Sequence, residues 1–339
     1  MNLKPNFLIF SFFVFIGFRL YSQDIHFSQY YASPLTLNAA NTGNFDGNFR
    51  LSNIYRSQWA AIGKPFRTLS IGFDKSFPIN NDAVGAGIVI VNDRSGDARF
   101  TNNKIYLSAS LKKQAGNHQI FIGIQPGFSS KTLSTVNTTL PDQWVMSSGS
   151  FENSALTQET ALTNGQSSFF DLNAGFAWRT KLAKSEPQFG VGLFHITQPQ
   201  ESFFNNGNKL PLRGSINFNI KYLLTPPYFI YPHFQYLAHS GASSLVVGSN
   251  VGKILEKNEL GIKTAHLGLA SRAGFGRNLD AMIVIAGMTI KNIDIGISYD
   301  VNVSALKTAT KNRGAFEISL IYIHPSTLLE KITTPCDRM

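Results

Sequence analysis

The sequence predicts an all-β fold, a transmembrane antiparallel β-barrel of about 14 strands with short periplasmic turns and longer extracellular loops. Three observations lead to this prediction. An apolar segment at the N-terminus is typical of exported proteins. Segments of roughly ten to twelve residues then alternate between apolar and polar side chains, which is the period of a β-strand. The connections between these segments alternate in length, as they do in barrels of the outer membrane.

Composition limits the class of protein before any segment is assigned. Of the 339 residues, 15% are charged and 12% are aromatic, and 28 are Gly. Soluble domains carry roughly 25% charged residues, and disordered chains are charged and poor in aromatic residues. The formal charge is +10, but Lys and Arg are scattered without a basic run, so we expect no nucleic-acid partner. This composition suits a wall that is apolar on one side and polar on the other.

Residues 1–22 have the layout of a secretory signal peptide. Lys4 gives a positive start, an apolar run extends from Phe7 to Phe18, and the small Ser22 precedes Gln23. The run of about twelve residues is too short to span a bilayer as a helix, and no later segment approaches that length. We expect cleavage after Ser22.

Residues 23–47 form a leader with neither a helical nor a strand period. It contains the stretch "QDIHFSQYYASPLTLNAANTGNF". An even number of strands places this leader on the periplasmic side of the barrel. It is either a flexible tail or a segment that Phe27, Tyr30, Tyr31 and Pro34 fold into the barrel mouth or offer to a periplasmic partner.

Strict alternation begins near residue 49. In segment 169–180, Phe170, Leu172 and Phe176 fall on one face of the strand, and Asp171 and Asn173 fall on the other. A tilted membrane strand needs about nine to eleven residues, and its backbone groups are satisfied only in a closed barrel. A soluble sandwich would have shorter strands and a more charged outer face. The expected strands are 49–57, 66–77, 84–92, 103–112, 118–129, 169–180, 188–197, 210–222, 228–238, 244–251, 259–271, 279–289, 292–301 and 314–323. Four residues of the polar faces are expected to line the lumen: Asp171, Arg179, Arg213 and Lys221.

The connections between these strands sort by parity. The odd ones are long and include the polar stretch 130–168, and the even ones are short. The main exception is 239–243, an odd connection that is short. Outer-membrane barrels have short periplasmic turns and longer outer loops, so the odd connections are expected to face outward. A loop as long as 130–168 is usually functional or disordered.

No pattern of catalytic or metal-binding residues emerges. The seven histidines occur in none of the zinc-binding spacings, and the chain lacks a nucleophile elbow and a phosphate-binding loop. The single cysteine, Cys336, excludes an intrachain disulfide. Segment 92–97, "NDRSGD", faintly resembles a calcium loop but lacks the closing glutamate, and a glycine-bearing turn is the simpler interpretation. We expect no cofactor, no metal and no enzymatic activity.

Several motifs resemble those of one family of membrane proteins. They are "HFSQYYASPLTLNAANTG" in the leader, "YRSQW" at 55–59, "FRTLSIGFD" at 66–74, "VNDRSGD" at 91–97 and "GAFEISLIY" at 314–322. In this order, and with a closing Pro335, Cys336 and Arg338, they resemble the PorP/SprF family of type IX secretion membrane proteins of Bacteroidetes. The departures are Ala40–Asn41, where the family favours a Pro-Ala-like pair, and Met339, where it favours an aromatic residue.

This resemblance implies an integral outer-membrane barrel that takes part in protein secretion and, in gliding relatives, in the export or display of adhesins. The implied partners are outer-membrane lipid, periplasmic secretion components and a cargo protein with a type B C-terminal sorting domain. The chain then divides into a signal peptide (1–22), a periplasmic leader or plug-like segment (23–47), the barrel (48–324) and a periplasmic tail (325–339). The family-motif positions that are candidate partner contacts are Phe27, Tyr30, Pro34, Asn38, Arg56, Trp59, Asn92, Asp93, Arg94, Gly96 and Asp97.

Other functions are compatible with the same barrel. A passive porin or hydrophobic-solute channel is the main alternative, because about fourteen strands can enclose a lumen. An outer-membrane enzyme has no motif to support it. Under the secretion hypothesis, we expect cargo to dock on the outer loops, through segment 137–165 and by strand addition to an exposed sheet edge.

Overall fold

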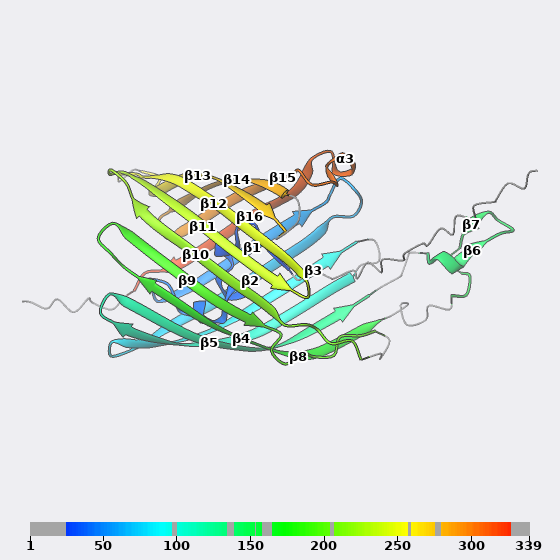
Figure 1. Cartoon of the computed structure of the whole chain (residues 1–339), viewed down its shortest axis with the longest axis horizontal. Helices are drawn as coiled ribbons and strands as arrows, with labels where there is room; N and C mark the ends of the chain where they lie inside the picture. The colour runs from blue at the N-terminus through cyan, green and yellow to red at the C-terminus, as the bar shows by residue number, and fades with distance from the viewer. Residues whose placement is uncertain are drawn as a thin grey trace, which may run out of the picture.

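Fourteen antiparallel strands close into a barrel in the computed structural model (Figure 1). The structure describes residues 25–96, 100–133, 139–152, 154–157, 165–203, 207–256, 259–274 and 279–326, so the expected signal peptide, Asp97 and Cys336 lie outside it. Each strand pairs with its neighbours in the sequence, and β1 pairs with β16 to close the wall. The predicted fold class is therefore confirmed.

The barrel strands coincide with the fourteen predicted segments. Their bounds are β1 Phe49–Gln58, β2 Phe66–Ile79, β3 Asp82–Ser95, β4 Phe100–Ala115, β5 His118–Thr132, β8 Gln166–Thr180, β9 Ser185–Phe194, β10 Arg213–Leu223, β11 Tyr228–His239, β12 Ala242–Ile254, β13 Ile262–Ala273, β14 Leu279–Ile290, β15 Ile293–Asn302 and β16 Arg313–His324. Strand ends differ from the predicted ones by at most three residues, and for two of them the backbone gives the reason. β9 stops at Phe194 because His195 has a φ of 60°, and β13 starts after Gly261, whose φ is 69°.

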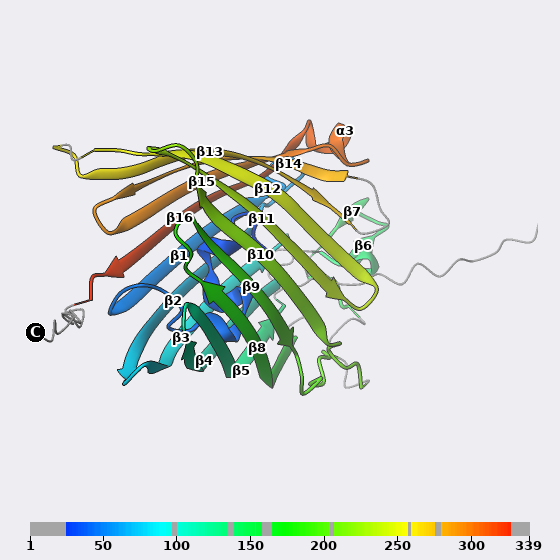
Figure 2. The same ribbon diagram turned by 60° about the vertical axis from the view of Figure 1, so that its left-hand side comes forward.

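The connections gather at two ends of the barrel. At one end lie 59–65, 96–99, 133–165, 195–212, 240–241, 274–278 and 303–312, and at the other lie 80–81, 116–117, 181–184, 224–227, 255–261 and 291–292. We call these the long-connection end and the short-turn end (Figures 1 and 2). Length follows parity with three exceptions. Connection 240–241 is short, as predicted for 239–243, connection 96–99 is no longer than 181–184, and connection 255–261 is long. The connection 133–165 carries a small hairpin of β6 Trp144–Val145 and β7 Ser150–Phe151, and 303–312 carries α3 Lys307–Thr310.

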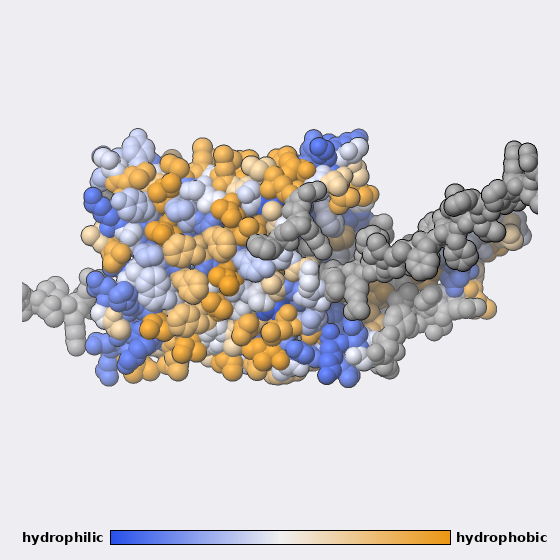
Figure 3. Space-filling model, in the orientation of Figure 1, coloured by the Kyte–Doolittle hydropathy of each residue, from blue (hydrophilic) through white to orange (hydrophobic). Residues whose placement is uncertain are grey.

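The wall is apolar outside and polar inside. Large aliphatic side chains such as Leu107, Leu111 and Leu267 are more than 60% exposed on the outer surface. Figure 3 shows apolar residues over the middle of the visible face and hydrophilic residues toward both ends. The buried side chains of the strands are largely Ser, Asn, Gln, Asp and Arg. This inversion is the pattern of a barrel whose outer face contacts lipid. No helix of the described residues is long enough and apolar enough to cross a membrane.

Candidate functional site: the leader and its seat

The leader, residues 25–47, lies inside the barrel (Figures 1 and 2). It consists of three short turns, η1 Tyr30–Ala32, α1 Pro34–Leu37 and η2 Ala39–Asn41. Pro34 suits the first position of α1, where its missing N–H has no helical partner. The Asn38 side chain then accepts from the Ala40 N–H at 2.9 Å and starts η2. These turns explain why the leader sequence shows no sustained period.

The leader runs the length of the lumen. Arg213, the first residue of β10 at the long-connection end, donates to the Ile25 carbonyl at 3.2 Å. Asp46 accepts from Arg179 at 2.5 Å and from Lys181, in the short turn 181–184, at 2.6 Å. The sequence prediction placed the leader at the periplasmic side alone. The structure differs because polar groups of the leader find partners at both ends of the barrel.

A buried charged cluster holds the first part of the leader. The Ser28 and Gln29 N–H groups donate to the Glu317 carboxylate at 2.7 and 2.8 Å. The Ser28 hydroxyl contacts Asp300 at 2.8 Å and accepts from Arg56 at 2.9 Å. We call Ser28, Gln29, Arg56, Arg272, Asp300 and Glu317 the latch.

The charges of the latch compensate one another within the wall. Arg56 pairs with Glu317 and, at 3.1 Å, with Asp300. Arg272 pairs with Asp300 at 2.8 Å and with Asp280 at 2.7 Å. Asp300 and Glu317 are fully buried. A buried charge is tolerable only when it is paired and hydrogen-bonded, and these pairs meet that condition without the leader.

Seven small residues form a continuous row across the opposite wall. Each pairs directly with the next along the strands β2, β3, β4, β5, β8, β9 and β10. This Gly–Ser row consists of Ser76, Gly85, Ser110, Gly123, Gly175, Gly192 and Ser215. Because directly paired residues share a face of the sheet, the row is a shallow groove that crosses the strands.

Residues 37–43 of the leader follow this row. A methyl group on Gly123 would overlap the Ala39 carbonyl, and one on Gly175 would overlap the Asn38 side chain. At the next strand, the Ser110 hydroxyl donates to the Thr42 carbonyl at 2.5 Å. The absence of side chains on the wall therefore lets the leader backbone touch it directly.

The Asn38 side chain hydrogen-bonds to the wall at the centre of the groove. Its amide nitrogen donates to the carbonyls of Phe176 at 2.9 Å and Val191 at 3.2 Å. It is fully buried, as are Ala39 and Ala40. A buried amide with partners on both ends fixes the position of the leader along the row.

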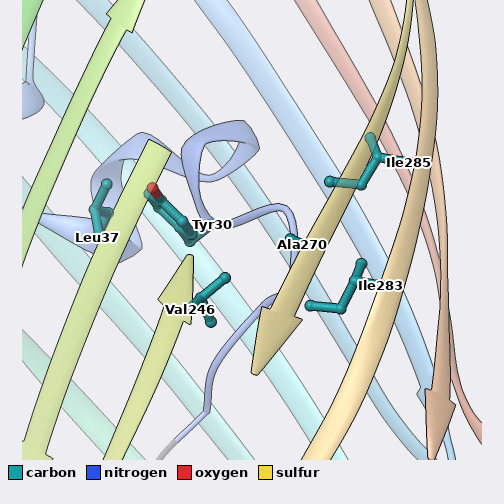
Figure 4. Packing of buried hydrophobic residues seen from close by; sticks show 6 residues of the cluster. All are labelled: Tyr30, Leu37, Val246, Ala270, Ile283 and Ile285. Atoms are coloured by element: carbon teal, nitrogen blue, oxygen red, sulfur yellow. The ribbon is translucent and has the colours of Figure 1, made fainter. Parts of the chain in front are cut away.

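Apolar side chains of the leader pack on the remaining wall. Tyr30 and Leu37 lie against Val246, Ala270, Ile283 and Ile285 of β12, β13 and β14 (Figure 4). On β11, the ring of His233 lies 5.8 Å from Tyr30 and 5.4 Å from Tyr31. Together with the Gly–Ser row, these contacts surround the leader.

Two cavities touch the leader. Both are lined in part by Ile25 and Arg213, and their volumes are about 30 and 20 Å³. A site of this size holds a water molecule or two. Within the described residues, no group of three or more His, Cys, Asp or Glu side chains is placed to bind a metal.

The structure brings part of the candidate set into the lumen. Phe27, Tyr30, Pro34 and Asn38 are buried in the leader, and Arg56 belongs to the latch. Arg56 pairs with Thr68, and Thr68 pairs with Asp93, whose carboxylate accepts from the Thr68 hydroxyl at 2.6 Å.

The other family-motif positions lie apart from the leader. Trp59 begins the first long connection with a φ of 59° and packs edge-on against Phe66. Asn92 and Arg94 lie near the end of β3, and Gly96, with a φ of 69°, starts the turn that follows. The turn predicted for segment 92–97 begins only at Gly96, because residues 92–95 continue β3 and pair with β4. Asp97 lies outside the described residues.

The four proposed lumen residues have different surroundings. Asp171 is fully buried and contacts the Tyr106 hydroxyl at 2.8 Å and His195 at 2.7 Å. Arg179 and Arg213 are buried and contact the leader. Lys221 is half-buried and lies 5.1 Å from the Phe229 ring centre.

Sequence reasoning missed the partners of the leader. Ser28, Gln29, Glu317, Asp300 and Arg272 were not among its candidates, and neither was the Gly–Ser row. The sequence did contain one indication, which is that charged residues occur within the alternating strands. A buried charge on a membrane strand needs a partner. The partners themselves lie 272 and 289 residues from Ser28, so local patterns could not pair them.

A lipid-facing barrel with a polar lumen and an internal segment that fills it defines a class, the plugged outer-membrane β-barrels. Within this class, the family of type IX secretion system membrane proteins PorP/SprF matches residues 20–322 of this chain. The chain belongs to that family, as its motifs predict. It is an integral protein of the outer membrane. No curated protein matches the chain.

Solved structures with a similar fold are outer-membrane barrels. The Pseudomonas putida toluene transporter TodX is 9% identical, with a TM-score of 0.50 over 85% of this chain and 92% of that chain. The Ralstonia pickettii toluene transporter TbuX is 10% identical, with a TM-score of 0.48 over 85% and 92%. OmpF of Salmonella typhi in complex with daunomycin is 10% identical, with a TM-score of 0.37 over 82% and 98%. At these identities, the likeness to TodX is one of fold alone.

Proposed function

We propose that this protein is a non-enzymatic accessory of type IX secretion that helps export or surface-anchor cargo with a type B C-terminal sorting domain. In gliding cells, that cargo includes adhesins. The observation that carries the proposal is the family match, which spans the leader and nearly all of the barrel. The position of the leader supports an accessory role, because a segment bonded to the wall on both sides of the lumen stands in the way of a passing polypeptide.

The two ends of the barrel suggest how the partners divide. The short-turn end, with the first residues of β1, faces the periplasm and meets the periplasmic secretion components. The long-connection end faces outward and meets cargo. Connection 133–165 is the longest element there, and its β6–β7 hairpin lies beyond the barrel rim (Figure 1). The motif residues Trp59, Asn92, Asp93 and Arg94 belong to this end as well.

A passive porin or solute channel is the competing function. It rests on barrel size alone, since the likeness to TodX concerns only the fold. The leader weighs against it, because the leader is hydrogen-bonded to Glu317 of β16 on one side of the lumen and to Phe176 of β8 on the other.

Deletion of the gene tests the secretion role. We expect one or more proteins with a C-terminal sorting domain to remain in the cells instead of reaching the surface or the medium. Quantitative proteomics of cells, surface and medium measures this, and the deletion strain complemented with the intact gene is the control. Unchanged surface and medium proteomes would remove the support for a secretion role.

Replacement of segment 137–165 by a short linker tests the outer end separately. The barrel should still insert, because every pair between β5 and β8 lies outside this segment. A gentle detergent pull-down with mass spectrometry should then recover the periplasmic components but no longer the cargo. Cargo recovered in undiminished amount would place the docking site elsewhere.

A further inference from the structure

We infer that the groove along the Gly–Ser row is a peptide-binding site, and that the leader is a resident ligand which a separate polypeptide segment can replace. The replacing segment shares the chemistry of residues 37–43, an asparagine followed by small residues. This goes beyond a role in secretion, which does not by itself require the leader to move.

The first argument is that the groove recognises a polypeptide backbone. The wall contacts the Ala39 carbonyl at Gly123 and the Thr42 carbonyl at Ser110, and Asp74 accepts from the Gly43 N–H at 2.7 Å. Two side chains in this stretch hydrogen-bond to the wall: Asn38 donates to two wall carbonyls, and the Thr42 hydroxyl bonds to the Ser108 hydroxyl of β4. A segment with an asparagine, small neighbours and a hydroxyl residue four positions later offers the same groups.

The second argument is that the wall does not need the leader. The barrel closes through β1 and β16, and no leader residue takes part in its strand pairing. The arginines of the latch remain paired with Asp300, Glu317 and Asp280 when Ser28 leaves. The other inward side chains are largely polar, so water can solvate them in place of the leader.

The third argument is that the described part of the leader is joined covalently to the wall at its C-terminal end. Its chain continues into β1 at the short-turn end, where Gly47 lies so close to Ile323 that a methyl group would not fit. Ile25 and Ser28 lie at the other end, and hydrogen bonds hold them there. Release of the latch therefore frees the end that is farthest from the tether.

The tether sets the conditions for exchange. A segment linked by a short chain competes at an effective concentration on the order of a millimolar. A separate peptide must approach that concentration, or the latch must be weakened, before it occupies the groove. The Ser28→Ala, Gln29→Ala double variant keeps the two N–H bonds to Glu317 but removes the side-chain bonds of Ser28 to Asp300 and Arg56 and of Gln29 to Ser298. In this variant we expect about tenfold more bound peptide, because a larger fraction of the barrels is open.

A disulfide lock on the full-length protein tests the inference. The Ser33 and Ser70 hydroxyl oxygens lie 3.1 Å apart, one on the leader and one on β2, so a Ser33→Cys, Ser70→Cys protein in a Cys336→Ser background can join leader and wall. The probe is a synthetic peptide of residues 34–44 with a photoreactive leucine at position 37. Labelling of the reduced protein should exceed labelling of the oxidised protein about tenfold.

Matched variants separate groove binding from misfolding. Gly123→Leu should abolish labelling of the reduced protein, because its side chain would occupy the groove. Gly214→Leu is the control, since a methyl group on this strand glycine meets nothing within 4 Å. A peptide with Asn38→Ala should label weakly. Heat-modifiable migration in electrophoresis shows that each variant is a folded barrel.

Each remaining result overturns the inference. Equal labelling of the locked and reduced proteins means that the peptide binds outside the groove. No labelling of the reduced protein at millimolar peptide means that the leader is a permanent part of the wall. Failure of the disulfide to form contradicts the seating of the leader on β2. None of these readouts depends on secretion, so they leave the proposed function to its own test.

Discussion

Arg56 is the residue on which leader and wall meet. It pairs with Glu317 and Asp300, both fully buried, and donates to the Ser28 hydroxyl at 2.9 Å. It also belongs to the "YRSQW" motif by which the sequence resembles its family. The motif residue therefore has a structural task that its sequence context does not reveal.

Replacement of Arg56 by methionine should destabilise the barrel by about 3–5 kcal/mol, the usual effect of removing one partner of a buried ion pair. Asp300 keeps Arg272, but Glu317 loses its arginine. The measurement is the urea midpoint or the temperature at which the folded band disappears in electrophoresis.

Lys113→Met is the matched control for this prediction. Its ammonium pairs with Asp82 at 2.8 Å, but the two side chains are 73% and 36% exposed. Exposed pairs contribute little, so the midpoint should barely move. Equal shifts in the two variants would contradict the importance of burial in the latch.

The leader, as an element, depends on a charge at its tethered end. Burial alone raises the pKa of the Asp46 carboxyl, but the nearby Arg179 and Lys181 outweigh burial and hold the pKa below its ordinary value. A lowered pKa in the folded state stabilises above the ordinary pKa and is lost as pH falls through the folded value. The pair is partly exposed, so its contribution is small.

Acid should therefore loosen this end of the leader first. As pH falls below about 4, amide hydrogens of residues 44–47 should exchange faster, while those of 38–42 stay protected by the Gly–Ser row. Hydrogen exchange with mass spectrometry measures both segments, after correction for intrinsic rates. In Asp46→Asn, the exchange of residues 44–47 should be fast at every pH. A wild-type response equal to that of the variant would contradict a role for the Asp46 charge.

The whole molecule is a barrel with the leader in its lumen, and this arrangement determines whether the protein conducts ions across a membrane. The intact protein in a planar bilayer should show no stable conductance, because the leader lies inside the barrel and is hydrogen-bonded to Glu317, Phe176 and Arg179 along the lumen. An open porin in the same bilayer is the control. Steady conductance of the intact protein would favour the passive-channel function over the accessory role.

The sequence predicts the structure of the wall better than that of the leader. The strands follow from alternation with a period of two, and the inward Asp171 and Arg179 follow from the same pattern. In segments 84–92, 244–251 and 259–271, glycine and small residues blur this period. Gly85, in the first of them, belongs to the Gly–Ser row, so a small residue that weakens the strand pattern is part of the seat of the leader.

The sequence by itself determined the wall of this protein, its strand number, its two faces and its family, because side-chain alternation and motifs are local along the chain. Only the tertiary structure decided where the leader lies. Its partners are Glu317 and Asp300 near the end of the chain and a row of small residues on strands β2–β10. Contacts between segments so far apart arise only when the barrel closes, and no local pattern records them.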